Sequence, residues 1–88
     1  GNHDAAALGA RTGMNDVAAA AIAWTRPRLS AASLDFIGRL PMRVEDGDML
    51  FVHADASRPE NWIYVTDTGV AMRSLLATPQ RVTFCGHV

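Results

Sequence analysis

The segment Met49-Leu50-Phe51-Val52-His53 decides the fold that the sequence predicts. Its first four residues are apolar on both faces of an extended chain, which is typical of a strand covered on both sides, although a short buried helix has the same pattern. A second segment, Val82-Thr83-Phe84-Cys85-Gly86-His87, is also an apolar strand that runs into a histidine. Because ligands of α/β proteins gather outside the carboxyl ends of strands, we expect the two imidazoles to converge on one point.

Upstream of these strands the sequence predicts an opening loop and two short consecutive helices. The first helix runs from about Asp16 to Thr25, and Asn15 is placed to cap it. The second follows a cap at Ser30 and ends where Pro41 stops the helical spacing of apolar residues. Both helices therefore precede the first strand.

The later part of the chain adds shorter elements. They are an extended Met42–Glu45, a tight hairpin turn at 46–48, a short strand or edge segment at Trp62–Val65, and a helix from Asp67 or Thr68 to Pro79. Strands mixed with helices in this order indicate an α/β fold. Without repeats or linkers, residues 1–88 are taken as a single unit.

Composition limits the function classes. A chain of 88 residues makes one domain at most, and its marginal stability follows from the small share of surface that such a chain buries. A formal net charge of -1 gives no broad basic field for nucleic acid or for an anionic membrane surface. No apolar run reaches membrane-spanning length. The single cysteine, Cys85, excludes an internal disulfide and fits a reducing cytoplasm.

Three polar groups are candidates for chemistry. The imidazoles of His53 and His87 can bind a divalent cation, although a lone histidine is more often a structural residue than a ligand. In the opening Gly1-Asn2-His3-Asp4, an amide oxygen can serve as a neutral metal ligand and a histidine can donate a proton. Asp4 could orient that histidine.

Together these motifs resemble a known family. Gly1-Asn2-His3-Asp4, Val52-His53-Ala54 and Gly86-His87 stand in the order of the later motifs of the calcineurin-like metallophosphoesterases, and the helices after the first motif resemble those of bacterial members. The resemblance implies the C-terminal portion of an αββα sandwich, in which helices flank a mixed sheet. The expected domain is thus a partial metallophosphoesterase domain over residues 1–88.

The resemblance also implies an activity and a cofactor. Members hydrolyse phosphomonoesters or phosphodiesters, small-molecule substrates among them, with a hydroxide that two divalent ions activate; manganese, iron and zinc suit such ligands. By similarity, Asn2, His53 and His87 are metal ligands. His3 and Asp4 are catalytic: His3 would donate a proton near the leaving group, and Asp4 would hold its imidazole in place.

Departures from the family pattern are as informative as the matches. The upstream Asp-x-His and Gly-Asp-x-x-Asp motifs are not in this sequence, and the chain stops at Val88, one residue before a further expected histidine. The chain alone is therefore expected to be inactive. A noncatalytic α/β binding module derived from the same superfamily is the alternative.

Other residues have ordinary structural interpretations. We expect core or edge packing for Trp24, a small buried apolar role for Cys85, a turn at Asp55 and a solvated surface position for Arg58 rather than a phosphate contact. Trp62 and Tyr64 follow a presumptive ligand, and for them packing and the shaping of substrate access are both open.

Overall fold

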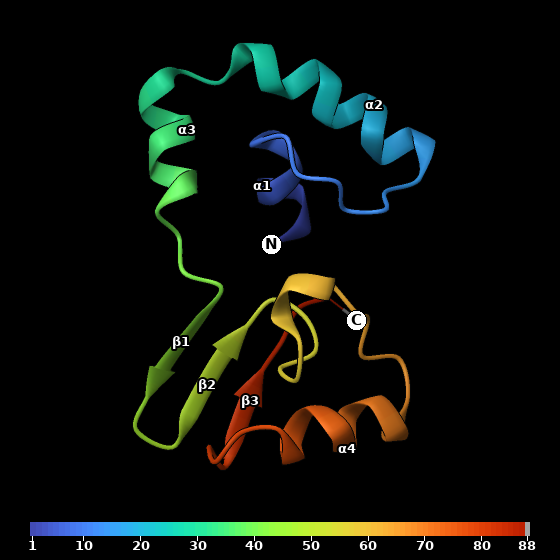
Figure 1. Cartoon of the computed structure of the whole chain (residues 1–88), viewed down its shortest axis with the longest axis vertical. Helices are drawn as coiled ribbons and strands as arrows, with labels where there is room; N and C mark the ends of the chain where they lie inside the picture. Colours follow the sequence, from blue (N-terminus) through green and yellow to red (C-terminus); the bar gives the residue numbers. More distant parts are fainter. Residues whose placement is uncertain (88) are drawn as a thin grey trace. The chain divides into compact units, whose positions relative to one another are not determined.

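The structure is a computed structural model that describes residues 1–87, and Val88 lies outside the described residues. The chain divides into two compact units, Gly1–Leu40 and Pro41–Val88. The first contains helices only, and the second contains the sheet (Figure 1). That residues 1–88 form part of one domain stays a prediction.

Helices α1, α2 and α3 and a short 3-10 helix make up the first unit. Their bounds are Asn2–Ala7 for α1, Asp16–Thr25 for α2, Arg26–Arg28 for the 3-10 helix η1 and Ala31–Gly38 for α3. The Asn15 side chain accepts a hydrogen bond from the Ala18 amide at 2.9 Å, and the Ser30 hydroxyl accepts one from the Ser33 amide at 3.0 Å. Both predicted caps are confirmed, because these side chains satisfy amides that the first turn leaves without helical partners.

The opening segment corrects the prediction of a loop. Residues 2–7 are helical, and Asp4 lies in the first turn, where its carboxylate accepts a hydrogen bond from the Gly1 amino group at 2.6 Å. The run Ala5 to Ala7 favours helix strongly, and a carboxylate in the first turn interacts well with the helix dipole. Local propensity therefore prevails over the turn-like appearance of Gly1-Asn2.

For Trp24, which the sequence predicts to pack in a core or at an edge, the core alternative is wrong. Its side chain is 63% exposed, and the Arg28 guanidinium lies 4.0 Å from the centre of its ring. Helix α2 contains no buried residue. Its alanines bury little apolar area, so the helix offers no deep interface that could enclose an indole.

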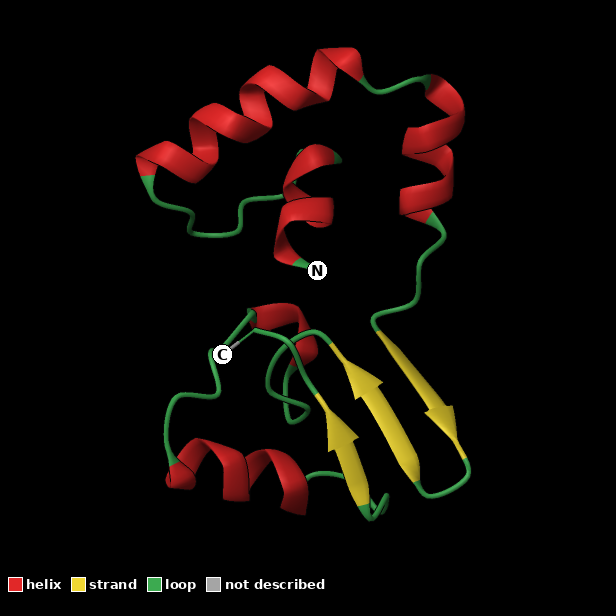
Figure 2. Ribbon diagram, turned by 180° about the vertical axis from the view of Figure 1, so that it is seen from behind, coloured by secondary structure: helices red, strands yellow, loops and turns green. Residues whose placement is uncertain are grey.

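The second unit is built on a mixed sheet with the strand order β1-β2-β3 (Figure 2). Its elements are β1 at Arg43–Asp46, β2 at Met49–Val52, the 3-10 helix η2 at Pro59–Asn61, α4 at Thr68–Leu76 and β3 at Val82–Phe84. β1 pairs with β2 in antiparallel and β3 pairs with β2 in parallel orientation. The predicted α/β class with a mixed sheet and helices is confirmed.

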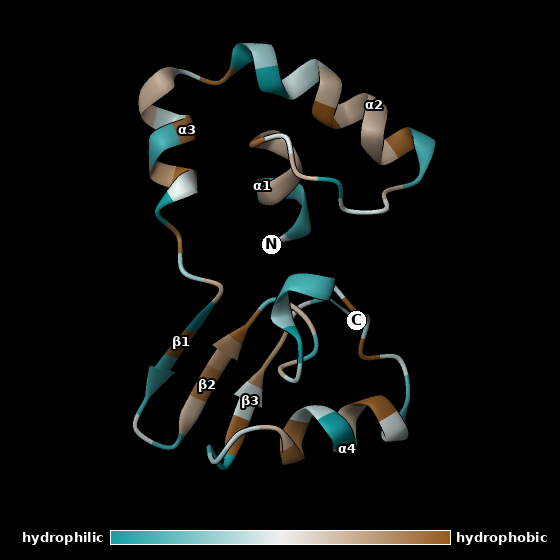
Figure 3. Cartoon of the chain, viewed as in Figure 1, coloured by the Kyte–Doolittle hydropathy of each residue, from teal (hydrophilic) through white to brown (hydrophobic). Residues whose placement is uncertain are grey.

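The two faces of β2 differ in exposure. Leu50 and Val52 are buried with Ala56, and Cys85 packs against them partly buried. Phe51, on the other face, is 41% exposed. The prediction of a strand covered on both sides is therefore wrong for the described residues, although β2 has the colour of hydrophobic residues in Figure 3.

Apolar side chains line up across the three strands on the exposed face of the sheet. Val44, Phe51 and Phe84 are register partners across the three strands, and the two phenyl rings stack with centroids 4.9 Å apart. All three side chains are more than two-fifths exposed. The described residues thus leave a row of apolar side chains in contact with water.

Among the described residues, no helix combines the length and hydropathy that crossing a membrane requires.

Candidate functional site

Two histidines lie side by side at one edge of the sheet. His53 follows β2 directly, and His87 follows β3 after Cys85 and Gly86. The ring centroids are 4.8 Å apart and the ring planes are inclined by 45°. Because β2 and β3 are parallel neighbours, their carboxyl ends meet at the same edge, and the topology itself brings the imidazoles together.

The backbone ties the two histidine segments to each other. The His53 carbonyl accepts hydrogen bonds from the amides of Gly86, at 3.1 Å, and His87, at 2.8 Å. These bonds continue the β2–β3 pairing past the last residue of β3. The main chain therefore fixes the separation of the two Cα positions, and the side chains need only choose their rotamers.

Aromatic side chains from the segment 62–65 flank the histidine pair. The Tyr64 ring stacks on the His87 ring with centroids 3.6 Å apart and planes inclined by 26°, and Trp62 meets His53 edge to face at 5.8 Å. Of the two predicted alternatives, a short strand or an edge segment, the strand is wrong, because the segment is loop; Trp62, at the end of η2, has a positive φ of 53°. A left-handed residue cannot be part of a strand, so no strand begins at Trp62.

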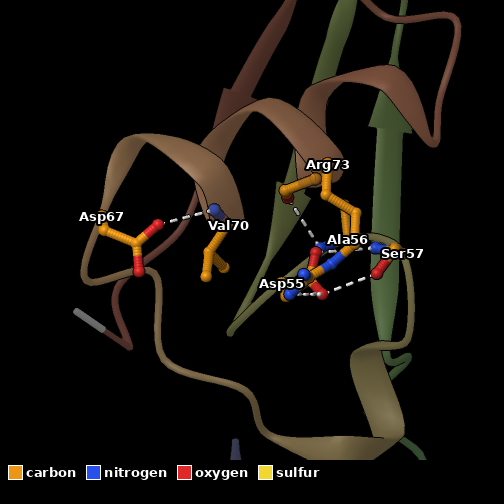
Figure 4. Close-up of polar contacts among 7 residues, drawn as sticks. Asp55, Ala56, Ser57, Asp67, Val70 and Arg73 are labelled. Atoms are coloured by element: carbon orange, nitrogen blue, oxygen red, sulfur yellow. Dashed lines mark hydrogen bonds and ion pairs between the residues drawn. The ribbon is translucent and has the colours of Figure 1, made fainter.

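Asp55 anchors the loop that follows His53. Its side chain is fully buried, and it accepts hydrogen bonds from the Ser57 amide at 3.0 Å and the Ser57 hydroxyl at 2.6 Å (Figure 4). The Arg73 guanidinium of α4 lies 3.6 Å away, and the Ser74 hydroxyl accepts a hydrogen bond from the Ala56 amide at 2.9 Å. The predicted turn at Asp55 is thus confirmed, and the turn is also joined to α4.

The pKa of Asp55 is lowered by its surroundings. Burial raises it, but the hydrogen bonds from Ser57 and Ser74 and the nearby Arg73 charge together outweigh burial. A carboxylate that accepts several hydrogen bonds is stabilised in its charged form. Asp55 is therefore an ionised structural group in the loop that follows His53.

Asn2, His3 and Asp4 lie in the first turns of α1, in the first unit. Asn2 is buried, and His3 and Asp4 are exposed. The Asp4 carboxylate pairs with the Gly1 amino group. The metal role of Asn2 and the catalytic roles of His3 and Asp4 stay predictions.

A complete metal shell needs more than the two imidazoles. Over residues 1–87, no group of three or more His, Cys, Asp and Glu side chains is placed to hold one ion. Catalytic zinc sites usually have three protein ligands. The pair could supply two nitrogen donors at most, so a metal ion bound there would need other donors as well.

Two features of the site are absent from the sequence prediction. The spacing of Asp55 and Ser57 signals a local turn, but nothing in the sequence marks Ser74 or Arg73 as partners of that turn. The contact between Tyr64 and His87 depends on the left-handed backbone at Trp62, which a non-glycine residue rarely adopts. Arg58 is exposed, as expected.

The chain resembles metallophosphoesterases in its fold, and comparison with solved structures confirms this resemblance. A metallophosphoesterase from Sphaerobacter thermophilus has a similar crystal structure, with a TM-score of 0.81 and 35% sequence identity, over 99% of this chain and 36% of that one. An uncharacterized protein of Methanocaldococcus jannaschii is 34% identical over an aligned stretch of 71 residues, and the match covers 74% of this chain and 29% of that protein. No family model matches the chain. The chain thus spans about a third of the length of these relatives.

Proposed function

We propose that the chain forms part of a metal-dependent hydrolase of phosphomonoesters or phosphodiesters. One observation carries the proposal: two histidines at the carboxyl ends of parallel strands lie with ring centroids 4.8 Å apart, in a chain that resembles a metallophosphoesterase along 99% of its length. Strand ends of α/β sheets are where such proteins gather their ligands.

The donor chemistry fits a divalent ion. Imidazole nitrogens suit manganese, iron and zinc, and the hydrogen bonds that the Gly86 and His87 amides donate to the His53 carbonyl hold the backbones of the two histidines together. In this proposal His53 and His87 hold one ion, and the resemblance assigns Asn2 to the same ion. When bound, the ions would polarise a phosphoryl oxygen and lower the pKa of a water molecule.

The other assigned residues would act on protons. His3 would donate a proton to the leaving oxygen, and Asp4 would keep the imidazole of His3 in the orientation that this transfer needs. These roles rest on the motif Gly1-Asn2-His3-Asp4. The substrate in this proposal is a small-molecule phosphoester, and the single thiol of Cys85 supports a reducing cytoplasm as the compartment.

A metal analysis and a chromogenic phosphoester assay test the proposal on a longer protein that includes this chain. His53→Ala and His87→Ala are each expected to lower kcat by more than about 100-fold, since even changes outside the ligand set cost 10- to 100-fold. Trp24→Ala is the matched control, because Trp24 is an exposed ring in the other unit. Full activity and metal content in both histidine variants would refute the proposal and favour the noncatalytic binding module.

A further inference from the structure

The ring of Tyr64 has an unusual position beside the histidine pair. It is 53% exposed, yet it lies over His87, which is only 7% exposed, with ring centroids 3.6 Å apart. We infer that Tyr64 is a positioning residue that holds the His87 imidazole in the orientation needed for binding a divalent cation. This inference rests on the function proposed above.

The geometry of the stack leaves the chemistry of the imidazole available. The nitrogen lone pair that binds a metal lies in the plane of the ring, and the Tyr64 ring covers a face, with planes inclined by only 26°. A contact on the face restricts rotation about the Cβ–Cγ bond of His87 without occupying either ring nitrogen. A hydrogen-bonding neighbour fixes a metal-binding histidine through its other ring nitrogen, whereas this contact fixes the ring plane.

The segment that carries Tyr64 is itself held at both ends. The Ile63 carbonyl accepts a hydrogen bond from the Asp55 amide at 3.1 Å, and the Val65 amide donates to the His87 carbonyl at 3.1 Å. Asp55 is in turn fixed by Ser57 and Arg73. A ring on a freely moving loop could not orient its neighbour, but this loop is joined to both histidine segments.

The phenol oxygen is not part of the inference. A stacking role needs the aromatic ring alone, so Tyr64→Phe is expected to behave like the unsubstituted chain. A role in proton transfer would instead need the hydroxyl group. The pair Tyr64→Phe and Tyr64→Ala therefore separates positioning from direct participation.

Nuclear magnetic resonance of the chain provides the test, with Mn²⁺ as the probe, because paramagnetic broadening detects weak binding. In Tyr64→Ala, the His87 ring protons should lose the shift caused by the Tyr64 ring current. The Mn²⁺ concentration that broadens the His53 and His87 signals should rise about tenfold, the lower end of the effect of support groups on metal affinity. Tyr64→Phe and Trp24→Ala, the latter in the other unit, should match the unsubstituted chain.

The outcomes separate the inference from the proposed function. Equal Mn²⁺ broadening in Tyr64→Ala and the unsubstituted chain overturns the positioning role, while the metal site stands. The positioning role is also overturned if the Mn²⁺ concentration needed for broadening rises as much in Tyr64→Phe as in Tyr64→Ala, because the hydroxyl would then be responsible. If Mn²⁺ broadens neither histidine in the unsubstituted chain, the metal assignment fails and the inference fails with it. Unchanged amide shifts along β2 and β3 show that each variant is folded.

Discussion

Asp55 shows at the scale of one residue how a buried charge can be a structural part of a loop. Its side chain has no exposed surface, yet its pKa lies below the ordinary value because burial is outweighed by Ser57, Ser74 and Arg73. A buried charge with several partners is costly to disturb, since removing the charge leaves the partners without their acceptor. The loop after His53 depends on this arrangement.

We predict that Asp55→Asn lowers the free energy of unfolding by about 1–3 kcal/mol near neutral pH. Because the pKa of Asp55 is lowered in the folded state, its contribution is fully present above the unfolded-state pKa and is lost as pH falls through the folded-state pKa. The difference between the two proteins in urea unfolding should therefore shrink in acid. Glu60→Gln, at an exposed carboxylate, serves as the control, and a difference that grows in acid would contradict the prediction.

At the scale of elements, helices α2, α3 and α4 each begin at a side chain that accepts a hydrogen bond from an amide of the first turn. Asp67 accepts a hydrogen bond from the Val70 amide at 2.9 Å at the start of α4, which the close-up of this region shows (Figure 4). Helix α4 also carries Arg73 and Ser74, which contact the loop that follows His53. The cap thus affects the site through the helix that it starts.

Replacing the cap tests this connection. Asp67→Ala should lower the free energy of unfolding by about 1 kcal/mol, the usual cost of losing such a cap. Amide hydrogen exchange should quicken at Val70 and also at Ala56, whose amide donates to Ser74. Thr68→Ala, the next residue along the helix, should leave both rates unchanged. If the Ala56 amide is equally protected in Asp67→Ala and in the unsubstituted chain, the start of α4 and the loop that follows His53 are independent.

The sequence predicts the regular elements well because their signals are local. Asn15 and Ser30 each cap a helix as expected, α4 begins at Thr68 as one of the two expected starts, and the hairpin turn is made at Gly47, whose φ of 54° suits glycine. Helix α1 was not predicted, because the motif Gly1-Asn2-His3-Asp4 was interpreted from its polar residues alone. Alanine propensity decided the structure there.

The site is predictable only in part, for a physical reason. Strand order brings His53 and His87 to one edge, so patterns along the chain suffice to pair them. The stacking of Tyr64 and the link from Asp55 to α4 are contacts between residues about 20 positions apart that share no periodic pattern. Such contacts depend on loop backbone angles, above all on the left-handed Trp62.

At the scale of the whole molecule, the charge balance of the proposed site limits what this chain can bind. Asn2, His53 and His87 are neutral donors, and they leave the charge of a divalent ion uncompensated. Isothermal titration of the 88-residue chain with manganese should therefore find no pair of tight sites, and His53→Ala should weaken the remaining heat signal. Two tight sites would contradict the proposed division of ligands between this chain and the rest of a longer protein.

The carbonyl oxygen of His53 accepts hydrogen bonds from two amides of the segment that contains His87. Slippage of either strand by a single position would break both bonds at once and would send one imidazole to the opposite side of the sheet. Evolution can therefore vary the loops around this edge in length and composition, but an insertion or deletion within either strand separates the two rings in one step.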